Sequence, residues 1–185
     1  MQAQEMANAF AGYMRKAVDP DWREAVSAAI YWYTRTNGTA AGADGSIILL
    51  QAALERLAWQ VLVRDKVVLS SDGFTRLPAA DQLRLLLDRC CVPLQIPSSL
   101  KALASQAAAF NWADGPQAFV ETRNSVVHPP KRANSPKPPI AIFDAWCLGQ
   151  YPELVLLKLF DFNGKYSNRT REPRWVGQVE SVPWA

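Results

Sequence analysis

The stretch SIILLQAALERLAWQVLVR, residues 46–64, decides the fold. Its apolar residues recur three or four positions apart, which is the periodicity of an α-helix. One stripe consists of Ile47, Leu50, Leu54, Leu57 and Val61, and a second consists of Ile48, Ala52, Trp59 and Leu62. A helix that is apolar over most of its circumference usually lies at the centre of its bundle. Residues 46–64 therefore predict a central helix.

Glu55 interrupts the second stripe, because it lies between Ile48 and Leu62 on the same side of the predicted helix. Burying a carboxylate without a partner costs several kcal/mol, so such a group is normally paired with a cation. We therefore expect Glu55 to face a basic side chain from another helix.

Several more helices are expected around this one. Asp19-Pro20-Asp21 is typical of a helix start, and the chain should leave that helix at Asn37-Gly38. The remaining helices are expected over about 78–91, 98–110 with Ser98 or Ser99 as its cap, 116–128, and 140–160 with a kink at Gly149 and Pro152. Five or six helices with little strand signal indicate an all-α helical bundle.

The chain of 185 residues suits one domain with two flanking segments. We expect an N-terminal extension over 1–18, a helical domain over 19–162 and a C-terminal docking arm over 163–185. The arm carries Trp175, Val176, Val179, Val182 and Trp184. These apolar residues predict that the arm packs on the bundle as an extended segment or a short strand.

Composition argues against several classes of protein. No apolar run approaches the ~18 residues that cross a bilayer, so no membrane association is expected. The cysteines are Cys90, Cys91 and Cys147, and an odd number with two adjacent members indicates reduced thiols in the cytoplasm. The sequence has one histidine and neither metal-ligand spacing nor a Gly-rich phosphate loop. We therefore expect neither a metal nor a cofactor.

The net charge of +3 is concentrated in the last third of the chain. Residues 1–120 contain 11 basic and 11 acidic side chains, whereas residues 121–185 contain 9 basic and 6 acidic ones. A phosphate-bearing partner would find its positive surface there. The candidate RNA-binding residues are Lys131, Arg132, Lys137, Arg169, Arg171 and Arg174, with Trp175 and Trp184 as candidates for base stacking. A solvated basic tail that docks on the bundle explains the same residues.

Arg123 lies within the apolar stripe of the predicted helix 116–128. It is three positions from Val120 and Val126, and four from Phe119 and Val127. Such an arginine should have an anionic partner, and Glu55 on the central helix is the best candidate for a bidentate pair.

His128 is five residues after Arg123 and directly precedes Pro129. Because the residue before a proline avoids helical geometry, His128 should leave the helix and turn toward Arg123. Asn124, four residues before His128, can reach the adjoining turn. A histidine as acid and base with an arginine beside the phosphate suits RNA cleavage by a ribose 2′-OH. The alternative is structural: a core salt bridge and a cap on helix-end carbonyls.

The segment Arg123-Asn124-Ser125-Val126-Val127-His128 resembles the Arg-Asn-x-x-x-His motif of the HEPN superfamily. Leu50-Gln51-Ala52-Ala53-Leu54-Glu55-Arg56-Leu57 resembles the helix of some HEPN families that carries a buried glutamate facing that motif. The resemblance covers about residues 20–160 and implies a HEPN-like bundle.

The resemblance also implies a function. HEPN domains are usually metal-independent endoribonucleases in bacterial toxin, phage-defence or RNA-processing systems, and they commonly dimerise to form one composite cleft. Arg123 would stabilise the phosphate and His128 would be the acid and base. Asn124 would orient the histidine or substrate, with Glu55 and Gln51 in support.

The expected partners are RNA, a second copy, and an antitoxin or an upstream sensor domain. Pro130 stands where toxins restrained by a minimal nucleotidyltransferase have tyrosine, which puts that kind of antitoxin in doubt. The alternative function is a non-catalytic HEPN-like module that dimerises or binds RNA or protein.

Overall fold

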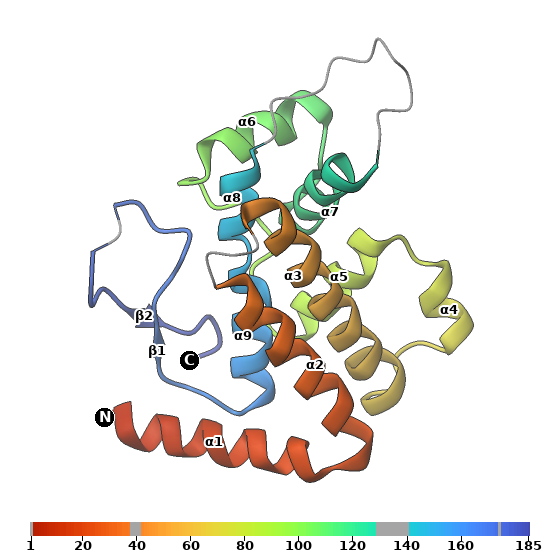
Figure 1. Cartoon of the computed structure of the whole chain (residues 1–185), viewed down its shortest axis with the longest axis vertical. Helices are drawn as coiled ribbons and strands as arrows, with labels where there is room; N and C mark the ends of the chain where they lie inside the picture. The colour runs from red at the N-terminus through yellow and green to blue at the C-terminus, as the bar shows by residue number, and fades with distance from the viewer. Residues whose placement is uncertain (1, 38–41, 129–140, 174) are drawn as a thin grey trace.

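The computed structural model describes residues 2–37, 42–128, 141–173 and 175–185. These residues form a mostly helical bundle with one small hairpin (Figure 1). The helices are α1 (Gln2–Val18), α2 (Pro20–Thr36), α3 (Gly42–Trp59), η1 (Gln60–Asp65), α4 (Ser71–Arg76), α5 (Ala79–Arg89), α6 (Lys101–Phe110), α7 (Gly115–Val127), α8 (Ile142–Cys147) and α9 (Gln150–Leu159). The strands β1 (Lys165–Tyr166) and β2 (Glu180–Ser181) pair antiparallel, with Lys165 opposite Ser181.

Helix α3 is the centre of the bundle, as its sequence predicts. It packs against α2, α5, α7, α8 and α9, and it continues into the π-helical turn η1. Every member of the first predicted stripe is buried. In the second stripe Leu62 is buried, but Ile48, Ala52 and Trp59 are only half-buried. The second stripe therefore lies along the margin of the core, and Glu55 lies there with it.

The predicted ends of several helices are confirmed. Asp19 caps α2, since its carboxylate accepts the Asp21 N–H at 2.9 Å, and Asn37 is the residue that ends α2. Helix α7 ends before His128, as the following proline requires. Helices α1 and α4, by contrast, are not among the helices expected from sequence.

Two local predictions were wrong. Neither Ser98 nor Ser99 caps α6, because the Ser99 hydroxyl instead donates to the Thr170 carbonyl of the distant C-terminal arm. The single kinked helix expected over 140–160 is two helices, α8 and α9, separated at Leu148 and Gly149. A Cβ on Gly149 would lie 2.7 Å from both Leu50 Cδ1 and the Trp146 carbonyl oxygen, so this close approach to α3 requires glycine.

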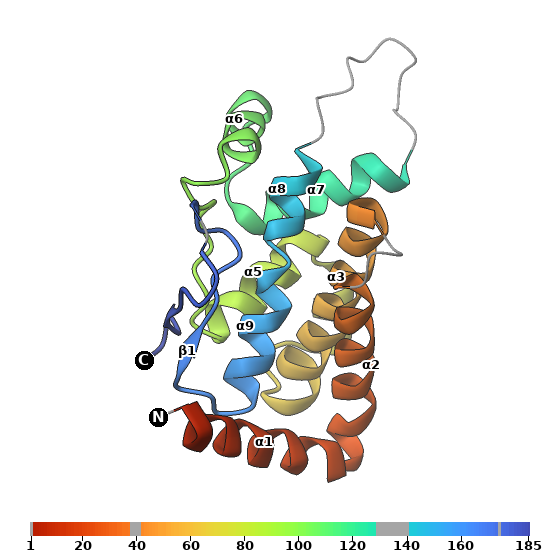
Figure 2. The ribbon, with the colours of Figure 1, turned by 60° about the vertical axis from the view of Figure 1, so that its left-hand side comes forward.

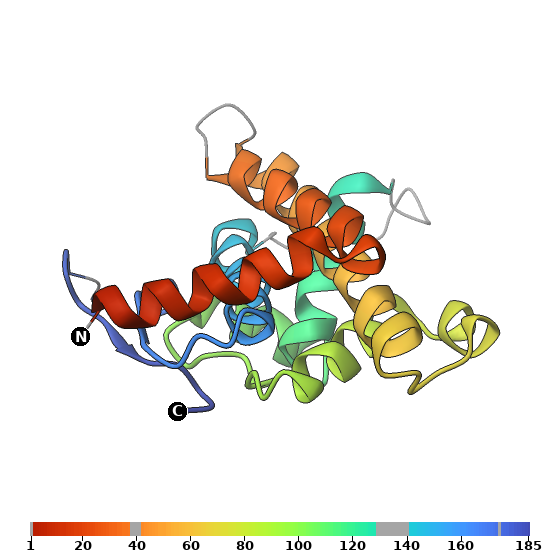
Figure 3. The same cartoon turned by 90° about the horizontal axis from the view of Figure 1, so that it is seen from below.

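Both ends of the chain pack on the same end of the bundle. Helix α1 lies across the ends of α2 and α9, and the β hairpin lies near its first turns (Figures 2 and 3). Ala9 of α1, Phe162 and Val182 form a small separate apolar cluster. Trp184 donates its indole N–H to the Phe162 carbonyl at 2.8 Å. The arm thus packs on the bundle through residues at its two ends, and it contacts α1 there.

One helical stretch, Gly42–Asp65, has the length and hydropathy of a membrane span, with a mean hydropathy of 1.4 over its best window. That window is 61% buried inside the bundle. Its apolar surface is therefore accounted for by the protein core.

Candidate functional site

Helix α7 carries the Arg123–His128 segment, and its first turn is firmly anchored. The Asp114 carboxylate accepts the Gln117 N–H at 3.0 Å, which is a side-chain N-cap. Arg84 of α5 donates to the same carboxylate from Nε at 2.5 Å and from Nη2 at 3.1 Å. Because the Asp114 side chain is only 13% exposed, this bidentate pair ties α7 to α5. The position of the motif on the bundle follows from this anchor.

The other end of α7 extends beyond the core. Val126 is half-buried, Val127 is 40% exposed and His128 is exposed. His128 has extended backbone geometry, with φ −107° and ψ 135°, and its N–H donates to the Asn124 carbonyl at 2.9 Å. The imidazole is thus accessible at the end of the helix.

Arg123 is half-buried on this last part of α7. Its Nη1 donates to the Asn124 side-chain oxygen at 3.3 Å. Its Nε is buried and has no hydrogen-bond acceptor among the described residues. Asn124 therefore contacts the Arg123 guanidinium through its side chain and the His128 N–H through its backbone carbonyl.

The predicted Glu55–Arg123 ion pair is wrong. No ion pair joins the two among the described residues, and Glu55 instead accepts a hydrogen bond at 2.7 Å from Nε2 of buried Gln51, one turn earlier on α3. The prediction assumed that both charges lie in the core. Both instead lie at its margin, where Glu55 and Arg123 are each half-buried and can remain unpaired.

The predicted RNA-binding residues fall into two groups. Lys131, Arg132, Lys137 and Arg174 lie outside the described residues. Arg169 and Arg171 each take part in an ion pair, with Glu153 and Glu180 respectively. Of the two tryptophans considered for base stacking, Trp184 is docked on the bundle and Trp175 is 69% exposed. Trp175 is thus the one whose ring is open to a ligand.

A second polar cluster, absent from the sequence-based prediction of catalytic residues, surrounds Arg169. Its Nη2 donates to the Tyr33 hydroxyl at 3.0 Å and to the Asn37 side-chain oxygen at 2.5 Å, and it pairs with Glu153. Tyr33 also donates to Glu153. Burial, followed by the nearby Glu153 carboxylate, raises the pKa of the Tyr33 phenol, which therefore stays protonated as the donor. Sequence spacing gave no signal for this cluster, because α2, α9 and the arm meet only in the folded chain.

Four cavities on the described surface lie near this second cluster or near α1, and none of the four is lined by Arg123 or His128. The largest of the four is about 540 Å³. It is lined by Asn37, Trp146, Glu153, Ser167, Arg169, Trp175, Val176 and Gly177. Among the described residues, the Arg123–His128 segment is therefore an exposed helix end that lines none of these four cavities.

Comparison with known proteins places the chain in a family. The model of the family described as the YopA C-terminal domain matches residues 19–181. The chain belongs to this family. It is also 29% identical over 176 residues to the SPbeta prophage-derived uncharacterized protein YopA of Bacillus subtilis strain 168. That match covers 95% of this chain but 39% of the relative, so the chain spans well under half of the relative's length. No solved structure matches the chain.

Proposed function

We propose that this chain is a HEPN-like, metal-independent endoribonuclease domain that acts in the cytoplasm, with Arg123 and His128 as its catalytic residues. The observation that carries the proposal is the arrangement at the end of α7. Arg123 is half-buried and has no ionic partner among the described residues, His128 is exposed five residues later, and Asn124 contacts the Arg123 guanidinium and the His128 backbone N–H. An arginine without an ionic partner and an exposed histidine at one helix end suit a phosphodiester that is attacked by its own 2′-OH.

The loss of the expected Glu55 pair supports this proposal. A guanidinium saturated by a buried carboxylate would have few donors left for a substrate phosphate. Among the described residues, the Arg123 side chain has one hydrogen bond, a long one of 3.3 Å, to a neutral amide. Its charge is therefore available to the developing negative charge on phosphoryl oxygens.

The open position of the site suits a composite cleft formed by two copies. A single exposed helix end excludes little water and holds a substrate on one side only. A second α7 facing the first would supply an opposite wall. The prophage origin in the relative's name supports a phage-related role for this domain. A role in defence or in a toxin system, with RNA as the target, is what the HEPN resemblance adds.

The test is cleavage of a mixed RNA pool in EDTA by the wild-type chain and by His128→Ala and Arg123→Ala. We expect cleavage by the wild type alone, with 2′,3′-cyclic phosphate ends. Ser125→Ala is the matched control, since Ser125 lies on the same helix end, is exposed and is not part of the motif's chemistry. Its cleavage rate should equal that of the wild type.

The free energy of unfolding of Arg123→Ala should lie within about 1 kcal/mol of the wild-type value, because no ion pair among the described residues is broken and Glu55 keeps its Gln51 partner. Both alanine variants cleaving RNA at the wild-type rate would refute the assignment.

The second candidate function is a non-catalytic module that binds RNA or protein and dimerises. The specific observation in its favour is that none of the four cavities contains Arg123 or His128. Absence of cleavage by the folded, dimeric wild type, together with RNA binding, would establish this second function in place of the first.

A further inference from the structure

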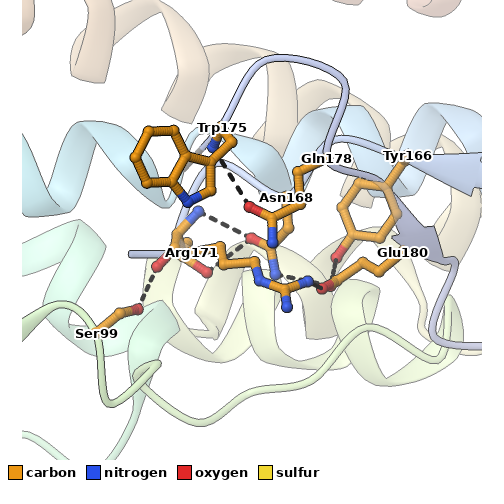
Figure 4. Close-up of polar contacts among 8 residues, drawn as sticks. Ser99, Tyr166, Asn168, Arg171, Trp175, Gln178 and Glu180 are labelled. Atoms are coloured by element: carbon orange, nitrogen blue, oxygen red, sulfur yellow. Dashed lines mark hydrogen bonds and ion pairs between the residues drawn. The ribbon is translucent and has the colours of Figure 1, made fainter. Parts of the chain in front are cut away.

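The C-terminal arm displays an exposed aromatic ring on a braced loop. Between β1 and β2, the chain runs out past Arg171 to Trp175 and returns to Glu180 (Figure 4). Trp175 is 69% exposed and Val176 is fully exposed. An isolated exposed apolar residue needs no explanation, but an adjacent Trp-Val pair over a cavity is typical of a binding surface.

Hydrogen bonds brace the base of this loop. One oxygen of the Glu180 carboxylate accepts from the Tyr166 hydroxyl at 3.1 Å and from the Asn168 amide at 2.8 Å (Figure 4). Its other oxygen pairs with Arg171 at 3.4 Å. The Ser99 hydroxyl tethers the loop to the bundle through the Thr170 carbonyl. The base of the loop that carries the exposed ring is thus fixed to the bundle and to β2, which lowers the cost of ordering it on binding.

Arg169, which lines the same cavity as Trp175, has unused hydrogen-bond donors. Among the described residues, all of its hydrogen bonds leave from Nη2, so Nε and Nη1 have no protein acceptor. The guanidinium also lies over the Trp146 and Tyr33 rings, at 5.4 and 5.6 Å from their centroids. These contacts fix the orientation of the guanidinium plane. The edge of the guanidinium that carries Nε and Nη1 has no acceptor among the described residues. A fork edge of this kind matches two oxygens of one phosphate.

The cavity combines these two features. Trp175 and Arg169 both line the 540 Å³ space, which lies within the 300–1,000 Å³ typical of small-molecule sites. Glu153 lines it too, and its negative charge is balanced by Arg169. The site is therefore close to neutral overall. Binding here depends on a stacked ring and one directed contact, more than on bulk positive charge.

We propose that this cavity binds one nucleoside phosphate unit, with the base stacked on Trp175 and the phosphate on Nε and Nη1 of Arg169. Proteins that bind single strands combine the same two elements, an aromatic platform and a cation on the backbone. The residues come from the arm, α2, α8 and α9, and none comes from α7. The site is thus separate from Arg123 and His128, and it holds whether or not the chain cleaves RNA.

The experiment measures binding of fluorescein-labelled hexauridylate and hexaadenylate by anisotropy. The protein is the full chain with His128→Ala, so that cleavage cannot consume the probe. Trp175→Ala should weaken binding about tenfold, from the loss of one stacked base, and Trp175→Phe should restore most of it. Arg169→Lys keeps the charge that Glu153 needs but removes the fork, and it should weaken binding to a similar degree.

Tyr31→Ala is the matched control, because Tyr31 is 54% exposed on α2 and does not line the cavity. It should bind like the parent chain. Since one phosphate is contacted, log Kd should change with log salt concentration by a slope of about 0.7. If free uridine or adenosine monophosphate competes with the probe, and this competition is lost in the same variants, the ligand is a free nucleotide. If only oligonucleotides compete, the ligand is an RNA chain.

Three results would overturn the proposal. The first is no binding of any probe by the folded parent chain. The second is binding by the Trp175→Ala and Arg169→Lys variants that is as tight as binding by the parent chain. The third is a steep salt dependence that the Tyr31 control shares with both variants, which would indicate diffuse attraction to the basic surface. Failure of RNA cleavage, by contrast, concerns only Arg123 and His128.

Discussion

Replacing Asp114 tests how α7 is anchored to the bundle. Its carboxylate performs two separable tasks: it caps the first turn of α7 through Gln117, and it pairs with Arg84. Loss of an N-cap costs about 1 kcal/mol. Loss of charge-assisted hydrogen bonds to a half-buried arginine adds roughly 1–2 kcal/mol, since Arg84 keeps Asp81 as a partner. Asp114→Ala should therefore lower the free energy of unfolding by about 2–3 kcal/mol.

The matched variant is Asp114→Asn, because asparagine caps helices as well as aspartate does but carries no charge. It should lose only the ionic part, roughly 1–2 kcal/mol. In a chain of this size each kcal/mol shifts the melting temperature by about 2–4 °C. Thermal unfolding should therefore place Asp114→Asn between the wild type and Asp114→Ala.

Two outcomes would refute this reasoning. If Asp114→Asn is as unstable as Asp114→Ala, the cap contributes nothing and the ion pair alone anchors the helix. If neither variant differs from the wild type, the carboxylate has no anchoring role. Arg84→Ala, made in the wild type and in Asp114→Ala, completes a double-mutant cycle. A coupling energy near zero would show that the Arg84–Asp114 pair does not stabilise the fold.

Three further predictions follow from the same structure. Gly12→Ala should separate α1 from the bundle and expose it to proteolysis, because a Cβ there would lie 2.2 Å from the Phe160 carbonyl oxygen; an unchanged cleavage pattern would contradict this. Exposed Cys91 should react with a thiol reagent in the native protein well before Cys90, whose thiol is buried with its pKa raised to about 12; peptide mapping by mass spectrometry checks the order. Burial and a neighbouring carboxylate raise the pKa of Tyr33 above its ordinary value of 10.0, so the folded state holds this proton more tightly than the unfolded state. The resulting stabilisation is complete below pH 10.0 and is lost as the pH rises through the raised pKa. Tyr33→Phe should flatten that alkaline decline in denaturant titrations between pH 8 and 11, and parallel curves would contradict it.

Local sequence determined most of the helical framework. The periodicity of residues 46–64 predicts the central helix, and Asp19 and Asn37 mark the ends of α2. Pro129 predicts the departure of His128 from α7. These features depend on near neighbours in the chain, because helical spacing, caps and proline sterics act over a few residues. They are therefore readable from one sequence.

Tertiary structure decided which charges meet. The sequence pattern indicates that Glu55 and Arg123 interrupt apolar stripes, but it does not show that both stripes lie at the margin of the core. The Glu55–Arg123 ion pair, which full burial of both groups would require, is therefore absent. The buried Nε of Arg123 has no acceptor among the described residues. The pairs that do form, such as Arg84 with Asp114 and Arg169 with Glu153, join segments that are adjacent only in the folded chain.

The C-terminal arm shows the same division. Its apolar residues predict that it packs on the bundle, but they do not show which tryptophan is buried. Trp184 donates to the Phe162 carbonyl, whereas Trp175 is exposed on a loop whose base is braced by hydrogen bonds to Glu180. The hydrophobicity of a residue shows that its burial is favourable in free energy. Only the packed structure decides whether an apolar surface and a hydrogen-bond acceptor lie within its reach.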